Sequence, residues 1–333
     1  MNPTQVLLLC GGGSAEHEVS MVSANYLESE LSKMSSVSVI RVEITKDEGW
    51  KDANGQPCRL NLDKTLNVGS TTVAIDYVVP CIHGFPGETG DIQSLLALSG
   101  LPFMGCDASA SIVCFNKITS KLWFDAIGIP NTPYVFLTDN NAESIAQAEE
   151  AFDLWGAIFV KAACQGSSVG CYKVTDKAAV KQAIEDAFTF SHQVLVEKAV
   201  RPRELEIAAY HFNGEVIVTN PGEISAPEDT FYTYEEKYST TSHSLTTVTP
   251  DNLTEENIAK MREYAEKAFV HLKLKDLSRI DFFLTDEGEV LLNEINTFPG
   301  MTPISMFPKL VEHNGHVFAD YLESCIKSGI AAN

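Results

Sequence analysis

The sequence predicts an α/β protein of two or three domains, and three observations support this prediction. Apolar runs typical of strands alternate with segments typical of helices, which is the pattern of helices covering parallel sheets. Hydrophobic residues make up 44% of the chain, a globular composition. The length of 333 residues exceeds that of one typical domain.

The first part of the chain predicts a parallel-sheet domain that ends near residue 110. An apolar run from Val6 to Cys10 stops at three glycines, Gly11 to Gly13. The elements expected after it are a helix from about Ser20 to Leu31, strands Val37 to Ile44 and Tyr77 to Ile82, and a helix from Asp91 to Ser99.

The remainder predicts further alternation of strands and helices. A helix is expected up to Ile127, then mixed elements to about residue 200. Beyond these we expect strands near 204–219, 277–285 and 289–295, and helices near 255–272 and 303–327. Residues 225–249 are rich in Ser, Thr, Tyr and Pro without clear periodicity, which predicts a mobile functional loop.

Charge and composition exclude several classes of function. A net charge of −21 argues against a nucleic-acid surface, although clustered lysines can still bind a polyanion such as ATP. No apolar run reaches the roughly 18 to 20 residues that span a bilayer, and no signal peptide is recognisable. The eight cysteines are scattered, with no C-x-x-C pair, which favours a reducing cytoplasm.

The glycines at 11 and 13 follow a strand and precede a helix, as in dinucleotide-binding turns. The third glycine of that fingerprint would fall at Glu16, where a carboxylate would repel a pyrophosphate. An ordinary strand-to-helix turn remains an alternative. Glu16 at a helix entrance could instead bind an ammonium group.

Two further glycine-rich segments follow strands. The first runs from His83 to Gly90, where open α/β sheets bind ligands; a structural histidine and plain turn glycines are the alternative. In the second, Lys161 ends an apolar strand and Gly166-Ser167-Ser168-Val169-Gly170 follows. Backbone amides and a lysine can hold phosphates there, whereas a simple hairpin turn is the other interpretation.

Polar residues interrupt two late strands at alternate positions. Arg279 shares a strand face with Asp281, and Glu294 shares one with Asn296. If the strands pair, Asp281, Glu294 and Asn296 converge as hard oxygen ligands for Mg²⁺. A surface ion-pair ladder is the alternative, but the apolar neighbours favour a site, because buried polar groups need partners.

Together these segments resemble the D-alanine–D-alanine ligase family of the ATP-grasp superfamily, over nearly the whole chain and in the family's motif order. The resemblance rests on residues 11–20, 83–90, 166–170, 235–238, 279–281 and 293–302. It implies an N-terminal domain (1–110) for the first D-alanine, a central lid domain (111–203), and a C-terminal domain (204–333) with the metal site and the mobile loop 225–249. ATP would lie between the central and C-terminal domains.

The resemblance also implies roles for individual residues. On the ATP side, the phosphates would be faced by Lys117, Lys161 and Lys237 and covered by Ser167 and Ser168. The adenine would be faced by Glu197 and Lys198, and the ribose by Glu204. Asp281, Glu294 and Asn296 would hold Mg²⁺ or Mn²⁺, with two ions expected. On the amino-acid side, Glu16 would bind the ammonium group of the first D-alanine and form hydrogen bonds with Ser167 and Tyr238. Ser305 and Met306 would lie near the carboxylate of the second D-alanine. Arg279 and the Gly300 N–H would stabilise the oxyanion, and His83 is a candidate proton acceptor or relay.

Three positions depart from the family pattern. Thr89 stands where an acidic residue is common, Ala162 follows Lys161 instead of proline, and Asn116 precedes Lys117 instead of aspartate. These departures bear on the geometry of the loops.

The function implied is ATP-dependent joining of two D-alanine molecules through a D-alanyl phosphate, for peptidoglycan precursor synthesis. Ester formation with D-lactate is one alternative, which Tyr238 disfavours. An ATP-binding regulator without chemistry is another, which Arg279, Glu16 and the metal ligands disfavour. A homodimer is compatible with this interpretation.

Overall fold

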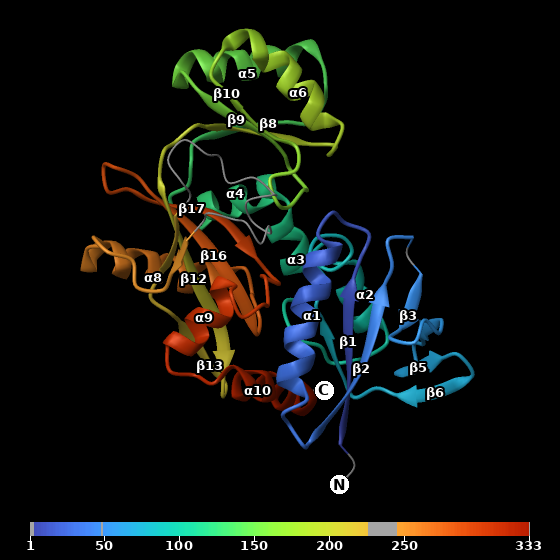
Figure 1. Cartoon of the computed structure of the whole chain (residues 1–333). Coiled ribbons are helices and arrows are strands. Elements are labelled where there is room, and N and C mark those ends of the chain that lie inside the picture. The colour runs from blue at the N-terminus through green and yellow to red at the C-terminus, as the bar shows by residue number, and fades with distance from the viewer. Residues whose placement is uncertain (1–2, 48, 226–244, 333) are drawn as a thin grey trace.

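Four β-sheets organise the described part of the chain, residues 3–47, 49–225 and 245–332, in this computed structural model (Figure 1). The first sheet has the strand order β3-β2-β1-β7. It is parallel from β2 to β7, with β3 antiparallel at its edge, so the predicted parallel α/β domain is confirmed. Its elements are β1 (Thr4–Gly11), α1 (His17–Leu31), β2 (Val37–Ile44), β3 (Trp50–Asp52), β7 (Tyr77–Pro80) and α2 (Asp91–Leu98).

A small antiparallel sheet beside it was not predicted from the sequence. It consists of β4 (Cys58–Leu60), β5 (Thr65–Val68) and β6 (Thr71–Ala74). Leu66 is its one fully buried hydrophobic side chain. Strands this short and polar leave almost no periodic signal.

The central sheet, order β10-β9-β11-β8, is antiparallel and carries two helices on one face (Figure 1, top). The Asn141 side chain caps the first of these helices, and Gly156 ends it in the left-handed region. The elements are β8 (Tyr134–Leu137), α5 (Ala142–Trp155), β9 (Ile158–Ala162), β10 (Cys171–Val174), a 3₁₀ turn at Lys177–Ala179, α6 (Val180–Phe188) and β11 (Val194–Lys198).

The largest sheet is antiparallel, with the order β15-β14-β12-β16-β17, and β13 also pairs with β12. Its elements are β12 (Arg203–Phe212), β13 (Glu215–Val218), β14 (Gly222–Ser225), β15 (Leu245–Thr247), α8 (Glu255–His271), β16 (Leu277–Leu284) and β17 (Val290–Asn296). The helices α3 (Ala108–Phe115) and α4 (Lys117–Ala126) contribute Cys114 and Phe124 to the core beneath it.

Two predicted elements were wrong in extent. The strand expected near 204–219 is the hairpin β12–β13, because Asn213 and Gly214 adopt positive φ angles of 52° and 87° and reverse the chain. The helix expected near 303–327 is instead α9 (Met306–His313) followed by α10 (Phe318–Ala331). Gly315, at φ 89°, ends the first of them.

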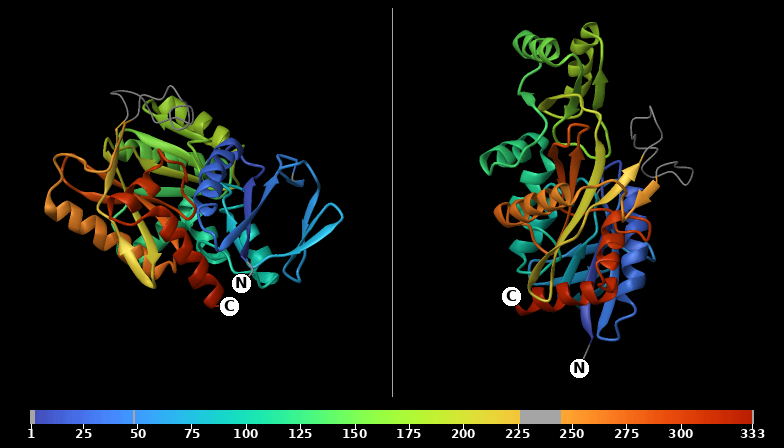
Figure 2. Two further views of the ribbon diagram at one scale, coloured as in Figure 1. Left: turned by 60° about the horizontal axis from the view of Figure 1, so that its bottom comes forward. Right: turned by 90° about the vertical axis from the view of Figure 1, so that its left-hand side faces the viewer.

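The C-terminal helices return to the N-terminal sheet. Tyr26 of α1 stacks on Phe318 of α10 with ring centroids 5.4 Å apart, and Tyr321 belongs to the same buried cluster as Tyr77 of β7. Both chain ends therefore lie at one end of the molecule, away from the central sheet (Figure 2). A search of the described helices finds no membrane-spanning candidate.

This packing generates a prediction at Gly329. An alanine usually stabilises a helix relative to glycine by about 1 kcal/mol, but a Cβ at Gly329 would lie 2.5 Å from Cε2 of the buried Tyr77 ring. We expect Gly329→Ala to lower the free energy of unfolding by at least about 1 kcal/mol, because overpacking outweighs propensity. Urea denaturation measures this, with the exposed Ser328→Ala as the matched control. A stabilised Gly329→Ala would contradict the packing described.

Candidate active site

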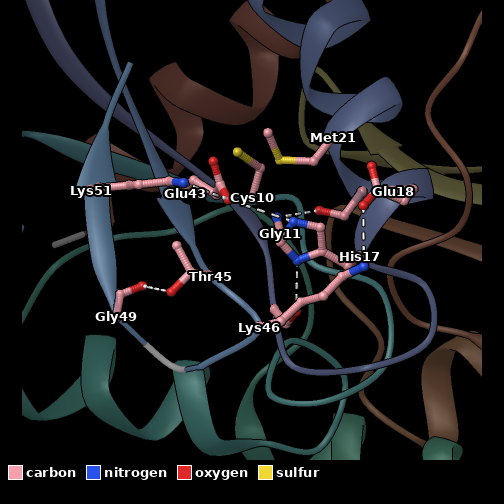
Figure 3. A network of polar contacts seen from close by, with 12 residues as sticks. Cys10, Gly11, His17, Glu18, Met21, Glu43, Thr45, Lys46, Gly49 and Lys51 are labelled. Atoms are coloured by element: carbon pink, nitrogen blue, oxygen red, sulfur yellow. Dashed lines mark hydrogen bonds and ion pairs between the residues drawn. The ribbon is translucent and has the colours of Figure 1, made fainter. Parts of the chain in front are cut away.

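The glycine turn after β1 is held by side chains of α1, among them His17, which lies beside Gly11 (Figure 3). Glu16 directly precedes this helix. The Gly11 N–H donates to Ser20 Oγ at 2.7 Å. His17 Nδ1 lies 2.8 Å from the Gly12 carbonyl oxygen; because a carbonyl only accepts, this ring nitrogen carries the hydrogen. These two hydrogen bonds hold the start of the turn, at Gly11 and Gly12.

The Glu16 carboxylate lies between two loops whose glycines leave room for it. A Cβ added at Gly84 or Gly166 would lie 3.0 or 2.7 Å from Glu16 Oε2. On the other oxygen, Ser167 Oγ donates to Glu16 Oε1 at 2.5 Å. Sequence-predicted residues from the N-terminal and central regions are thus brought into contact.

A cavity of about 510 Å³ opens beside this contact, a size suited to a small molecule. Its walls include Ser14, Glu16, Phe85, Phe115, Asn116 and Gly166. Arg279 and Glu294 are not among the lining residues, so the cavity represents the Glu16 end of the site.

The loop that carries Ser167 joins β9 to β10 and is backbone-strained. Ser167 and Ser168 have φ angles of 50° and 62°, a left-handed conformation that non-glycine residues rarely adopt. The Val169 N–H donates to the Gly166 carbonyl at 3.0 Å and closes the turn. Two successive strained residues are typical of a functional loop rather than a plain hairpin turn.

The strands β16 and β17 pair, which is the condition the sequence analysis set for a metal site. Asp281 faces Glu294, and Arg279 faces Asn296. Arg279 binds both carboxylate oxygens of Asp281, at 2.8 and 2.7 Å. Asn296 Nδ2 donates to Asp281 Oδ2 at 3.0 Å, which leaves the Asn296 side-chain oxygen as an acceptor.

Two further residues extend this cluster. Lys117 Nζ, at the start of α4, lies 3.7 Å from Glu294 and also donates to the Gln165 carbonyl at 2.7 Å. Glu206 of β12 lies 3.2 Å from Arg279 and was not predicted. It follows Glu204 by two residues and lies between the apolar Leu205 and Ile207, a signal that was present in the sequence. Burial alone would lower the pKa of Arg279, but Asp281 and Glu206 outweigh it and raise that pKa, so the guanidinium stays charged.

A buried ion cluster lies on the central sheet and α4. Glu197 contacts Lys161, which lies opposite Leu195 on the neighbouring strand β9. It also lies 2.6 Å from Lys121 Nζ. Burial would raise the pKa of Glu197, but the two lysines outweigh it and lower the pKa to about 2. Lys121 was missed in the sequence, although it follows Lys117 by one helical turn.

The remaining predicted residues fall at different depths. Lys198 and Glu204 are exposed, whereas Met306 is buried, close to Gly222. Ser305 Oγ lies 2.7 Å from Thr302 Oγ1, and a Cβ at Gly300 would be 3.0 Å from that Ser305 oxygen. His83 is buried, and burial lowers its pKa, which keeps the ring neutral near pH 7. Lys237 and Tyr238 lie outside the described residues.

The departures from the family pattern are accommodated locally. Asn116 Oδ1 accepts from the Ile118 and Thr119 N–H groups at 2.9 and 3.3 Å. It therefore caps α4 as an aspartate would. Thr89 Oγ1 donates to Asp91 at the start of α2. Ala162 is buried in β9.

Comparisons with known proteins agree over the whole length. The family models for the "D-ala D-ala ligase N-terminus" and "D-ala D-ala ligase C-terminus" match residues 5–106 and 123–327. A D-alanine–D-alanine ligase of Tolumonas auensis is 59% identical over 99% of this chain and 100% of the relative. The crystal structure of D-alanyl-alanine synthetase A from Vibrio cholerae has 58% identity, a TM-score of 0.95, and 99% coverage of both chains.

More distant structures keep the same architecture. The VanG D-Ala:D-Ser ligase of Enterococcus faecalis is 28% identical, with a TM-score of 0.87 over 98% of this chain and 99% of that one. The D-alanine-D-alanine ligase of Coxiella burnetii, at 29% identity, also has a TM-score of 0.87, over 100% of this chain and 95% of that one. The three-domain ATP-grasp fold expected from the sequence is therefore confirmed, and this chain belongs to the D-alanine–D-alanine ligase family.

Proposed function

We propose that this protein is a cytoplasmic ligase that joins two D-alanine molecules with ATP hydrolysis and supplies the dipeptide for peptidoglycan. The observation that carries the proposal is the contact between Glu16 and Ser167. It links a carboxylate suited to an ammonium group with a strained, glycine-flanked loop suited to phosphates. The eight free cysteines support a reducing compartment.

We assign the domains as residues 1–110, 111–203 and 204–333. Each part contains one of the larger sheets. The helix α3, which crosses the boundary at residue 110, and α4 of the second part pack beneath the third part's sheet. They would therefore act as the connection on which the central sheet is mounted.

The residues at β16 and β17 fit a divalent cation. No cluster of three His, Cys, Asp or Glu suited to a metal occurs within residues 3–47, 49–225 and 245–332. Asp281, Glu294 and the Asn296 oxygen offer two carboxylates and an amide, and Mg²⁺ is commonly held by one or two carboxylates together with substrate phosphates. Asp281, Glu294 and Asn296 would hold Mg²⁺, or Mn²⁺ as an alternative, with two ions expected, and the positive charge supplied there would offset that of the nucleotide phosphates.

For the first step, the protein's own groups position the reactants. Glu16 would hold the ammonium of the first D-alanine and direct its carboxylate towards the γ-phosphate. Lys117 of α4 and Lys161 of β9 would both face the triphosphate. Lys237, outside the described residues, is proposed to add a third positive charge. Positioning and charge balance are what phosphoryl transfer requires of the protein.

For the second step, the amine of the second D-alanine, after losing a proton, attacks the carbonyl carbon of the acyl phosphate, and phosphate leaves as the amide bond forms. Arg279, held by Asp281 and Glu206, and the Gly300 N–H would stabilise the oxyanion that forms. Ser305 and the first turn of α9 at Met306 would hold the second carboxylate, because helix N-termini favour anions. Phosphate release that depends on added D-alanine, with D-alanyl-D-alanine as product, tests the function. No phosphate release under any of these conditions would favour the regulator without chemistry, and an ester formed preferentially with D-lactate would favour the ester-forming alternative.

The metal assignment predicts a severe effect of Glu294→Gln. The amide keeps the shape of the side chain but removes the charge that would face the cation. Turnover should fall by at least about a hundredfold, with partial recovery at higher Mg²⁺. The exposed Glu289→Gln is the control. Turnover within about threefold of wild type would exclude the metal role.

The oxyanion assignment predicts that Arg279→Ala lowers kcat by at least about a hundredfold, near 2.7 kcal/mol. Arg279→Lys should recover little of this, because lysine cannot bind Asp281 through two parallel hydrogen bonds. Steady-state kinetics on folded protein measures both variants. A change confined to KM would indicate simple substrate binding instead.

The buried ion cluster predicts a role for Lys121 in ATP affinity. Without Lys121, the whole charge of Glu197 would act on Lys161, and the positive electrostatic potential at the phosphates would weaken. Lys121→Met should raise the KM for ATP by at least about fivefold, roughly 1 kcal/mol. The exposed Lys173→Met serves as the control. An unaltered KM for ATP in a folded Lys121→Met protein would refute this role.

A further inference from the structure

The segment Phe298–Met301, which follows β17 and contains Gly300, is held by buried side chains of the N-terminal domain. Ser23 of α1 accepts from the Met301 N–H at 3.2 Å. His83 Nδ1 lies 3.1 Å from the Phe298 carbonyl oxygen. Next to His83, the backbone N–H of Gly84 donates to the Glu88 carboxylate at 2.8 Å.

The hydrogens in this arrangement have one consistent direction. Because the Phe298 carbonyl only accepts, His83 Nδ1 carries the hydrogen. Nε2 of the neutral ring is then an acceptor, and Ser23 Oγ, 2.9 Å away, donates to it. The Ser23 oxygen in turn accepts from Met301. The hydrogen bonds run from the Met301 N–H through Ser23 and His83 to the Phe298 carbonyl.

Both ends of this hydrogen-bonded path lie in the same segment, one on each side of Gly300. The path therefore fixes the peptide plane between Phe298 and Pro299 and the peptide plane between Gly300 and Met301. The plane between them carries the Gly300 N–H, and it can turn only about one bond of Pro299 and one of Gly300, since the proline ring locks φ. Holding the two outer planes therefore restricts the direction of the Gly300 N–H.

Burial makes the arrangement stiff. Ser23 and Met301 are fully buried, and His83 and Phe298 are each 4% exposed. The site residues identified from the sequence include His83 and Gly300 but neither Ser23 nor Glu88. Both nitrogen atoms of His83 are occupied, so its geometry suits positioning rather than proton transfer.

We propose that Ser23 is a positioning residue of the ligase reaction, because its hydroxyl closes the hydrogen-bonded path that aims the Gly300 N–H at the developing oxyanion. The inference rests on the proposed function for its catalytic consequence. The hydrogen-bonded path itself can be tested without activity. The two parts are therefore separable by experiment.

The test uses Ser23→Ala in the full chain, with two measurements. Hydrogen exchange followed by mass spectrometry should show amide exchange in the 297–302 peptide at least about fivefold faster than in wild type. Kinetics should show kcat lowered on the order of tenfold, with the KM for ATP within about twofold. Purely structural damage would instead lower the amount of folded protein without this division between kcat and KM.

The matched control is Ser324→Ala in α10. Its Oγ also accepts from a distant backbone N–H, that of Asn213 at 2.9 Å, and it is buried. It should accelerate exchange near Asn213 and leave kcat unchanged. Ser23→Thr, which keeps the hydroxyl, should retain slow exchange at 297–302 if it folds.

The outcomes distinguish this inference from the proposed function. Unchanged exchange at 297–302 in Ser23→Ala overturns the positioning role, whatever the activity. Faster exchange with unchanged kcat also overturns it, because the direction of Gly300 would then not matter to the reaction. If wild type shows no D-alanine-dependent phosphate release, the proposed function fails, and the positioning role in the ligase reaction fails with it, whatever the exchange result.

Discussion

The contact between Glu16 and Ser167 is the constraint on which the arrangement of the site depends. A carboxylate at the start of α1 can approach a loop of the central sheet only where neither side presents a Cβ, and Gly84 and Gly166 meet that requirement. The turn before Glu16 is fixed by Ser20 and His17, so the loop that carries Ser167 must take the conformation that brings the two side chains into contact. The left-handed backbone of Ser167 is consistent with that adaptation.

The sequence predicted those parts of the fold that have a local cause. Strong apolar runs produced the parallel sheet and the paired strands β16 and β17, and alternation placed Arg279 with Asp281 on one face. The errors also have local causes. The hairpin at Asn213–Gly214 carried a turn signal that was overlooked, whereas the small sheet β4–β6 is too polar and too short to be recognised.

The residues missed at the site depend on contacts between distant segments. Ser23 is an ordinary helical serine until α1 is packed against the segment after β17, 278 residues later. The role of Lys121 becomes visible only in the folded protein, where α4 packs near β11 and Lys121 forms the second ion pair of Glu197. Side chains that act through another residue leave no motif, because their partners can come from any part of the chain.

The buried ion cluster of Lys121, Lys161 and Glu197 explains how a protein with a net charge of −21 can attract a polyanion. Lys121 is anchored by the Thr132 carbonyl at 3.0 Å and by Asn131 at 3.1 Å, so it cannot turn towards solvent. Its charge therefore acts through Glu197, which it helps to neutralise. Two lysines share one carboxylate, so one net positive charge remains at the Lys161 end, where the phosphates are proposed to lie. Where little water is present, this local positive charge acts more strongly on the phosphates than the distant acidic surface does, because solvent and salt screen the charges of that surface.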